Sequence, residues 1–288
     1  MAAAEGAIAS AAPLMDEQFL TAARAVLEAL DPNELAIGEE GTVGGDLALY
    51  SIFNTVPPEL TNALVNEMDA GCATSVFLDR CVGAVIGMAA GDALGAPLEF
   101  LDCVDEPGTG IAAFDMSTCG YRGPIWSNAS FDPLQPGQWT DDTSMALCLA
   151  DSLLIQQKFE GSDCVKRLWN WMARGYNTPF RHDENRGGDP EMRAFLAEAG
   201  LDANASLMSV GCGKGTKAVL IPLEQGADPP PEASNQQEFN GNGAIIRIAP
   251  VPLFCALRPD EAECVEMARA SARTTVSSIP IILLIVVC

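Results

Sequence analysis

The chain has 288 residues, enough for one large domain or for one domain plus an appendage, and 48% of them are hydrophobic, too many for a disordered acidic chain. Lys and Arg number 16 against 39 Asp and Glu, and the resulting net charge of −23 would repel nucleic-acid phosphates and anionic membrane surfaces. The single histidine, His182, excludes a metal site built from several histidines, so Asp and Glu are the expected agents of any chemistry.

The predicted elements begin with an N-terminal extension over residues 1–74, which we expect to be partly helical or disordered. Helical spacing over residues 16–30 and 59–68 is separated there by glycine- and proline-bearing joints. From residue 76 onward, apolar residues recur at helical spacing and long alternating strand patterns are missing. The predicted helices cover residues 76–94, 141–158, 162–174, 189–199, 213–225, 243–257 and 259–275. The fold class is therefore predicted to be all-α.

A glycine stripe marks the first long helix. Within residues 83–100, GAVIGMAAGDALGAPLEF, glycine recurs at every fourth position from Gly83 to Gly95, which taken alone favours close packing against another backbone. Packing does not explain Asp92 and Glu99, because a carboxylate near a helix C-terminus faces unfavourable electrostatics. A ligand, a cation or exposure to solvent would each compensate for that charge.

The next motif is a cluster of oxygen-bearing side chains that opens the helix within residues 137–154, GQWTDDTSMALCLADSLL. Thr140 is a good N-cap, and Asp141 and Asp142 fall in the first turn, where carboxylates are favoured. A well-capped amphipathic helix accounts for most of this pattern. The same hydroxyl and carboxylate oxygens also supply part of a coordination sphere for Mg²⁺, Mn²⁺ or Ca²⁺.

Two glycine-rich turns precede later helices. Residues 239–254, FNGNGAIIRIAPVPLF, place Asn240, Gly241, Asn242 and Gly243 before an apolar segment. Such a turn is ordinary, but a glycine-rich turn feeding a helix can also cradle a phosphate or pyrophosphate. Residues 210–216, VGCGKGT, are a fainter example. The aromatic residues Trp169, Trp171 and Tyr176 are predicted to be core.

The ten cysteines form no CxxC pair and fall in apolar stretches, which favours reduced thiols over a disulfide framework or a zinc site. The N-terminal residues lack basic side chains, and the apolar segment 279–288 is about half as long as a membrane-spanning helix. We therefore predict an intracellular, cytoplasmic protein without a membrane partner.

The motifs, taken in this order, resemble the ADP-ribosylglycohydrolase family, which includes the dinitrogenase-reductase-activating glycohydrolases. The resemblance covers about residues 79–275. It rests on these segments: GDALGAPLE at 91–99, WTDDT at 139–143 with Met145 and Ala146, GYN at 175–177, GCG at 211–213, GNG at 241–243 with RIAP at 247–250, and the Ser/Ala-rich helix at 271–275.

The resemblance implies an orthogonal helical bundle over residues 75–276 that binds ADP-ribose or an ADP-ribosylated protein. It implies Mg²⁺-dependent cleavage of the bond between ADP-ribose and a protein side chain, with two Mg²⁺ ions in the family and Mn²⁺ possible. Its metal ligands would be Thr140, Asp141 and Asp142. Its catalytic residues would be Glu99, as acid, base or gate, together with Asp141 and Asp142. Its ligand-binding residues would be Asp92, Asn240, Gly241, Asn242 and Gly243.

The sequence departs from the family pattern near its C-terminus. Thr274 and Thr275 are followed by Val276 where the family has His, and no Asp-x-Asp motif follows. We therefore expect the bundle to be incomplete, with a divergent apolar tail over residues 277–288. Two alternatives stay open: a catalytically inactive relative that binds ligand or serves structurally, and a helical scaffold in which 140–143 is only a cap.

Overall fold

The computed structural model describes residues 15–30, 56–98, 137–179, 209, 211–224, 241–256 and 260–276. Every regular element within these ranges is helical, and none is a strand, which confirms the predicted all-α class. The elements in order are α2 (Glu17–Ala29), α3 (Pro58–Cys72), α4 (Val76–Gly95), η3 (Ala96–Leu98), α5 (Asp141–Gln156), α6 (Gly161–Arg174), α8 (Lys214–Glu224), η7 (Asn242–Ala244), α9 (Pro250–Cys255) and α10 (Glu261–Arg273).

Local capping residues set several helix starts. Asp16, Ser75 and Asp260 accept hydrogen bonds from backbone amides in the first turns of α2, α4 and α10. Such a bond satisfies one of the amides that a helix N-terminus leaves without an intrahelical partner. α6 ends at Arg174, and its C-cap residue Gly175 has a φ of 75°, in the left-handed region that glycine adopts at low cost.

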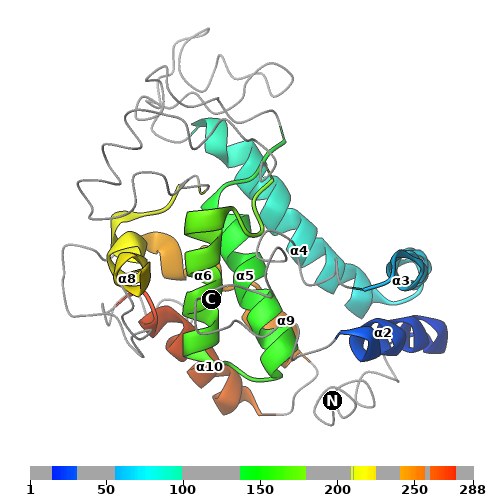
Figure 1. The fold of residues 1–288 in the computed structure, drawn as a ribbon. Coiled ribbons are helices and arrows are strands. Elements are labelled where there is room, and N and C mark those ends of the chain that lie inside the picture. Colours follow the sequence, from blue (N-terminus) through cyan, green and yellow to red (C-terminus); the bar gives the residue numbers. More distant parts are fainter. Residues whose placement is uncertain are drawn as a thin grey trace, which may run out of the picture.

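The hydrophobic core forms around α5 and α6, which lie side by side in the centre of the molecule (Figure 1). α8, α9 and α10 contribute most of the rest of the main buried cluster, and Tyr176, Cys212, Ala244 and Val276 lie outside these helices. Trp169, Trp171 and Tyr176 are all buried in this cluster, as predicted for core aromatic residues. α2 and α3 pack on each other, and Val26 and Leu30 join Ile155 of α5 in a second, smaller cluster.

The single helix predicted over residues 243–257 is wrong. The structure has the short 3₁₀ helix η7, then turns at residues 245–247 and 249, and α9 begins only at Pro250. Proline has no amide hydrogen and clashes with the preceding turn, so it is favoured at the first helical position and costs about 3 kcal/mol inside a helix. The helix predicted over residues 189–199 lies outside the described residues, as does the tail at 277–288.

The glycine stripe of α4 does not face another helix in the described part of the chain. A Cβ placed at Gly83, Gly87, Gly91 or Gly95 would have no neighbouring atom within 4 Å, and all four glycines are exposed. The packing interpretation of this stripe is therefore not supported where the structure can test it.

The prediction that the cysteines are reduced is wrong for one pair. Cys255 of α9 and Cys264 of α10 form a disulfide, with their Cα atoms 5.8 Å apart. The two cysteines are separated by nine positions in sequence and lie on successive helices, and no local pattern identifies them as a pair. The other cysteines for which the structure gives a state are free thiols, Cys72, Cys81, Cys148, Cys164 and Cys212, and burial raises the pKa of Cys212 to about 12.

Among the described helices, none is by itself both long and apolar enough to cross a membrane. Taken together, α3 and α4 meet the length and composition criteria, but their axes bend by 117° where they join.

Candidate functional site

The N-terminus of α5 is capped by a carboxylate from another helix. Asp92, near the end of α4, has 8% of its surface exposed and accepts hydrogen bonds from the Thr140 amide at 3.0 Å and the Thr143 amide at 3.0 Å. The Thr140 hydroxyl also donates to Asp92, at 2.6 Å. Thr140 is the N-cap residue, as predicted, but its side chain makes no capping bond of its own.

This contact explains how the fold tolerates a carboxylate at the end of an apolar helix. The positive end of the α5 dipole and two of its backbone amides compensate the Asp92 charge. The predicted compensation by ligand, cation or solvent is therefore not required. A direct role of Asp92 in ligand binding stays a prediction.

The two carboxylates of the first α5 turn are half-buried beside a glycine loop. A Cβ placed at Gly211 would lie 2.0 Å from Asp141 Oδ1, so the Asp141 side chain lies directly against the backbone of Gly211. Gly211 also has a φ of 85°, a conformation that side-chain-bearing residues rarely adopt. Asp141 and Asp142 benefit from the helix dipole of α5, which favours negative charge at this end.

The asparagine–glycine turn lies beside α8 and α5. A Cβ placed at Gly243 would lie 3.1 Å from Thr216 Oγ1 at the start of α8 and 3.9 Å from Met145 Cε, one turn into α5. The structure thus places Gly211 against Asp141, and Gly243 beside Thr216 and Met145. Glu99 and Asn240, predicted as a catalytic and a ligand-binding residue, lie outside the described residues.

A buried polar network holds the segment that leads into α5. The Trp139 indole nitrogen donates to the Asn177 carbonyl at 3.2 Å, and Asn177 Nδ2 donates to Asp151 Oδ2 at 2.9 Å. The Tyr176 hydroxyl donates to the same Asp151 oxygen. The GYN motif at 175–177 therefore positions Trp139 and, through it, Thr140. Sequence reasoning placed Tyr176 in the core but did not foresee this network.

We expect this network to give the protein a pH-dependent stability term. Desolvation raises the pKa of Asp151 despite hydrogen bonds from Tyr176 and Asn177 and the charge of Arg167. Between the unfolded pKa of about 3.9 and the higher native value, the native state binds more protons than the unfolded state. The contribution of Asp151 to the free energy of unfolding therefore falls as pH rises through this interval.

The comparison that isolates this term is between the wild-type chain and Asp151→Asn. Asparagine keeps an acceptor oxygen for Tyr176 and Asn177 but does not titrate. In urea unfolding between pH 4 and neutrality, the wild-type free energy minus the variant free energy should decrease as pH rises. A difference that stays constant or increases would contradict the raised pKa.

The metal-ligand set is partial within the part of the chain that the structure describes. The adjacent carboxylates of Asp141 and Asp142 are hard oxygen donors of the kind that Mg²⁺ and Mn²⁺ prefer. No group of three or more His, Cys, Asp or Glu side chains with metal-binding geometry occurs among the described residues. The donors fit a divalent cation in type, and further ligands must come from other residues, substrate or water.

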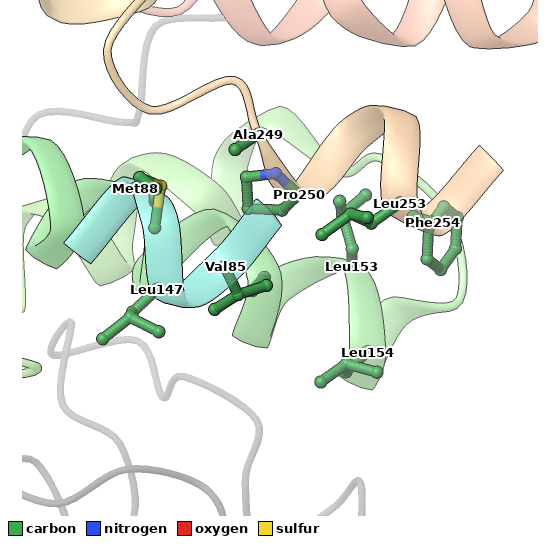
Figure 2. A pocket seen from close by; sticks show the side chains of 11 residues that line it. Val85, Met88, Leu147, Leu153, Leu154, Ala249, Pro250, Leu253 and Phe254 are labelled. Carbon is green, nitrogen blue, oxygen red and sulfur yellow. The ribbon is translucent and has the colours of Figure 1, made fainter. Parts of the chain in front are cut away.

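A separate pocket of about 270 Å³ lies between α4, α5 and α9 (Figure 2). Its lining is apolar, with Val85 and Met88 from α4, Leu147 from α5, and Pro250 and Phe254 from α9. Asp141 and Asp142 are not among its lining residues. The pocket offers no polar side chain for acid–base or metal chemistry, so we distinguish it from the candidate site.

Comparison with known proteins gives a family match and several similar proteins. Residues 73–282 match the model of the family described as ADP-ribosylglycohydrolase. The ADP-ribosylarginine hydrolase Tri1 of Pseudomonas putida is 34% identical over 178 residues, covering 62% of this chain and 36% of the relative. The ADP-ribosyl-[dinitrogen reductase] glycohydrolase of Rhodospirillum rubrum is 35% identical over 94 residues, covering 33% of this chain and 29% of the relative. The chicken ADP-ribosylhydrolase ARH3 is 25% identical over 196 residues, covering 68% of this chain and 44% of the relative. The matches thus span less than half the length of each of these relatives.

Proposed function

Because this chain belongs to the ADP-ribosylglycohydrolase family, we propose that it hydrolyses the bond between ADP-ribose and a protein side chain. The observation that supports this most is the arrangement at the N-terminus of α5, where Asp141 lies against Gly211 and Thr140 bonds to Asp92. Two of the similar proteins carry names that specify ADP-ribosylarginine as substrate, so arginine is the acceptor we propose first.

In this proposal Asp141 and Asp142 hold a divalent cation, with Mg²⁺ preferred and Mn²⁺ as the substitute. When bound, such a cation supplies Lewis-acid polarisation and activates water. The turn at 241–243, with Asn240, approaches the diphosphate, and Asp92 keeps the first turn of α5 in place. Glu99 acts as the general acid or base that transfers the proton, as the family resemblance implies. The reaction breaks the bond between the ribose anomeric carbon and the guanidine nitrogen, adds a hydroxyl from water to the carbon and leaves a proton on the nitrogen.

The direct test uses the full chain with an ADP-ribosylarginine peptide. Release of free ADP-ribose, followed by chromatography, should require added MgCl₂ and stop when EDTA is in excess. A parallel ADP-ribosylserine peptide tests the choice of acceptor. Absence of release from both peptides at saturating Mg²⁺ and Mn²⁺ would overturn the hydrolase proposal.

A second candidate function is ligand binding without turnover. It is favoured by the partial ligand set, since no group of three or more His, Cys, Asp or Glu side chains that could hold a metal ion occurs among the described residues. Calorimetry with ADP-ribose separates the two functions: binding together with release of product supports the hydrolase, and binding without release supports the inactive relative. If ADP-ribose neither binds nor is released from the peptides, the result favours the scaffold alternative.

Substituting Gly211 with alanine tests the arrangement of Asp141. The new Cβ would displace the Asp141 carboxylate and would also force alanine into a left-handed conformation. We expect Mg²⁺ affinity to fall about 10- to 100-fold, the usual cost of disturbing groups that orient a metal ligand. Titration calorimetry with MgCl₂ measures the Mg²⁺ affinity of the variant and of the wild-type chain.

The matched control is Gly213→Ala in the same loop. A Cβ at residue 213 would meet no atom within 4 Å, and Gly213 is not among the described residues with positive φ. This variant should bind Mg²⁺ like the wild type. Equal losses of Mg²⁺ affinity in both variants would show that the loop is sensitive to any substitution and would contradict the specific role of Gly211.

A further inference from the structure

Arg247 is a fully buried cation without an acidic partner among the residues that the structure describes. It has 0% of its surface exposed, and its hydrogen bonds go to neutral oxygens only. The other fully buried arginine, Arg167, forms an ion pair with Asp163 at 2.8 Å. A buried charge normally requires such a partner, so the charge of Arg247 must be compensated in another way.

The guanidinium of Arg247 connects two segments that are distant in sequence. Its Nη1 donates to the Gly243 carbonyl at 3.0 Å. Its Nη2 donates to the Ser271 carbonyl at 2.8 Å and to Thr274 Oγ1 at 3.0 Å, both at the C-terminal end of α10. The last turn of a helix carries unpaired carbonyls and the negative end of the dipole, which replaces a carboxylate as the compensating charge.

The same contacts control the orientation of the asparagine–glycine turn. The carbonyl and amide of a trans peptide point in opposite directions, so holding the Gly243 carbonyl inward also fixes the direction of the following amide. Gly243 is further confined by Thr216, which a Cβ would approach to 3.1 Å. The turn is thus held from α8 on one side and, through Arg247, from α10.

We propose that Arg247 is a positioning residue that fastens the turn at 241–244 to the end of α10 and so preorganises it for the diphosphate of ADP-ribose. The ligand named here rests on the proposed function. Only a planar group with several fixed donors can hold the Gly243 carbonyl and the α10 terminus together, and lysine, with one ammonium group, cannot. Preorganisation of the turn lowers the cost of ordering it when ligand binds.

The test compares Arg247→Lys and Arg247→Met with Leu168→Ala, a core substitution in α6 that destabilises the fold without touching the turn. Hydrogen exchange reports on the turn directly, because the amides of Ile245 and Ile246 bond to the Asn242 carbonyl. We expect both Arg247 variants to exchange these amides at least about tenfold faster than Leu168→Ala does. Equal exchange in the three variants would overturn the proposal.

The second readout is ligand affinity. We expect the Kd for ADP-ribose and the KM for substrate to rise about 10- to 100-fold in both Arg247 variants while kcat changes much less, because substrate and transition state lose the same contact. Leu168→Ala should leave both constants unchanged. If the wild-type chain does not bind ADP-ribose, the proposed function fails, and the exchange result alone decides the role of Arg247.

A milder variant covers the case in which the Arg247 variants do not fold. Thr274→Val removes one acceptor of Nη2 and leaves the Ser271 carbonyl in place. It should raise exchange at Ile245 and Ile246 by a smaller factor in the same direction. No change in exchange in this variant, with Arg247→Met unfolded, would mean that Arg247 serves the stability of the core and does not position the turn.

Discussion

Asp92→Ala is expected to lower the free energy of unfolding by about 3 kcal/mol, because two backbone amides and the Thr140 hydroxyl lose a charged acceptor in a buried place. The substitution also leaves the N-terminus of α5 without its cap, for which the usual cost is about 1 kcal/mol. Urea unfolding of the full chain measures the change. Any hydrolysis should fall as well, since Asp141 and Asp142 stand on the turn that Asp92 holds.

Two comparisons make this prediction specific. Asp92→Asn keeps one acceptor oxygen but turns an amide group toward backbone donors, so it should lose about half as much stability as alanine. Asp79→Ala removes an exposed carboxylate from the first turn of the same helix and should cost no more than about 0.5 kcal/mol. Similar losses at residues 79 and 92 would show that the capping contact contributes little.

Most helix positions could be predicted from the sequence because local patterns determine them. The helices predicted over residues 76–94, 141–158 and 162–174 agree with α4, α5 and α6 within two residues at each end. Capping side chains and apolar spacing are adjacent in sequence, so they can be recognised without knowing the fold. The failure at 243–257 came from giving apolar spacing more weight than Pro250, although the proline is an equally local signal.

The candidate site could be predicted only in its parts. The oxygen-bearing residues at 140–142 and the glycine turns stand out as motifs, but their assembly depends on contacts across the fold. Asp92 lies 48 residues before Thr140 in sequence, and the Arg247 contacts span 24 and 27 residues. The sequence contains no spacing rule for such pairs. The Gly211 contact had only a weak signal in the sequence, a pair of glycines before a helix. The role of Gly211 can be recognised only in the structure, where it lies against Asp141.

Asp141→Asn is expected to abolish Mg²⁺ binding at the site and with it any Mg²⁺-dependent hydrolysis, a loss of at least about 100-fold. The charge is needed because an amide oxygen is a much weaker ligand for a hard cation than a carboxylate. Asparagine keeps the size of the side chain and loses the interaction of the charge with the α5 dipole, which contributes about 0.5 kcal/mol, so the cost to stability should be small beside the loss of metal binding. A large effect on metal binding beside a small effect on stability is therefore the signature of a ligand.

Thermal unfolding with and without MgCl₂ provides a readout that does not depend on activity. A cation that binds only the native state stabilises it by about 2.7 kcal/mol at a concentration 100 times its Kd, so the wild-type Tm should rise with MgCl₂ and the Asp141→Asn Tm should not. Glu261→Gln removes an acid from the first position of α10 and has the same loss of dipole interaction, so it should keep the full Mg²⁺ response. If Asp141→Asn responds to MgCl₂ as Glu261→Gln does, residues 140–143 only begin a helix, and the chemistry proposed for this end of α5 has no basis.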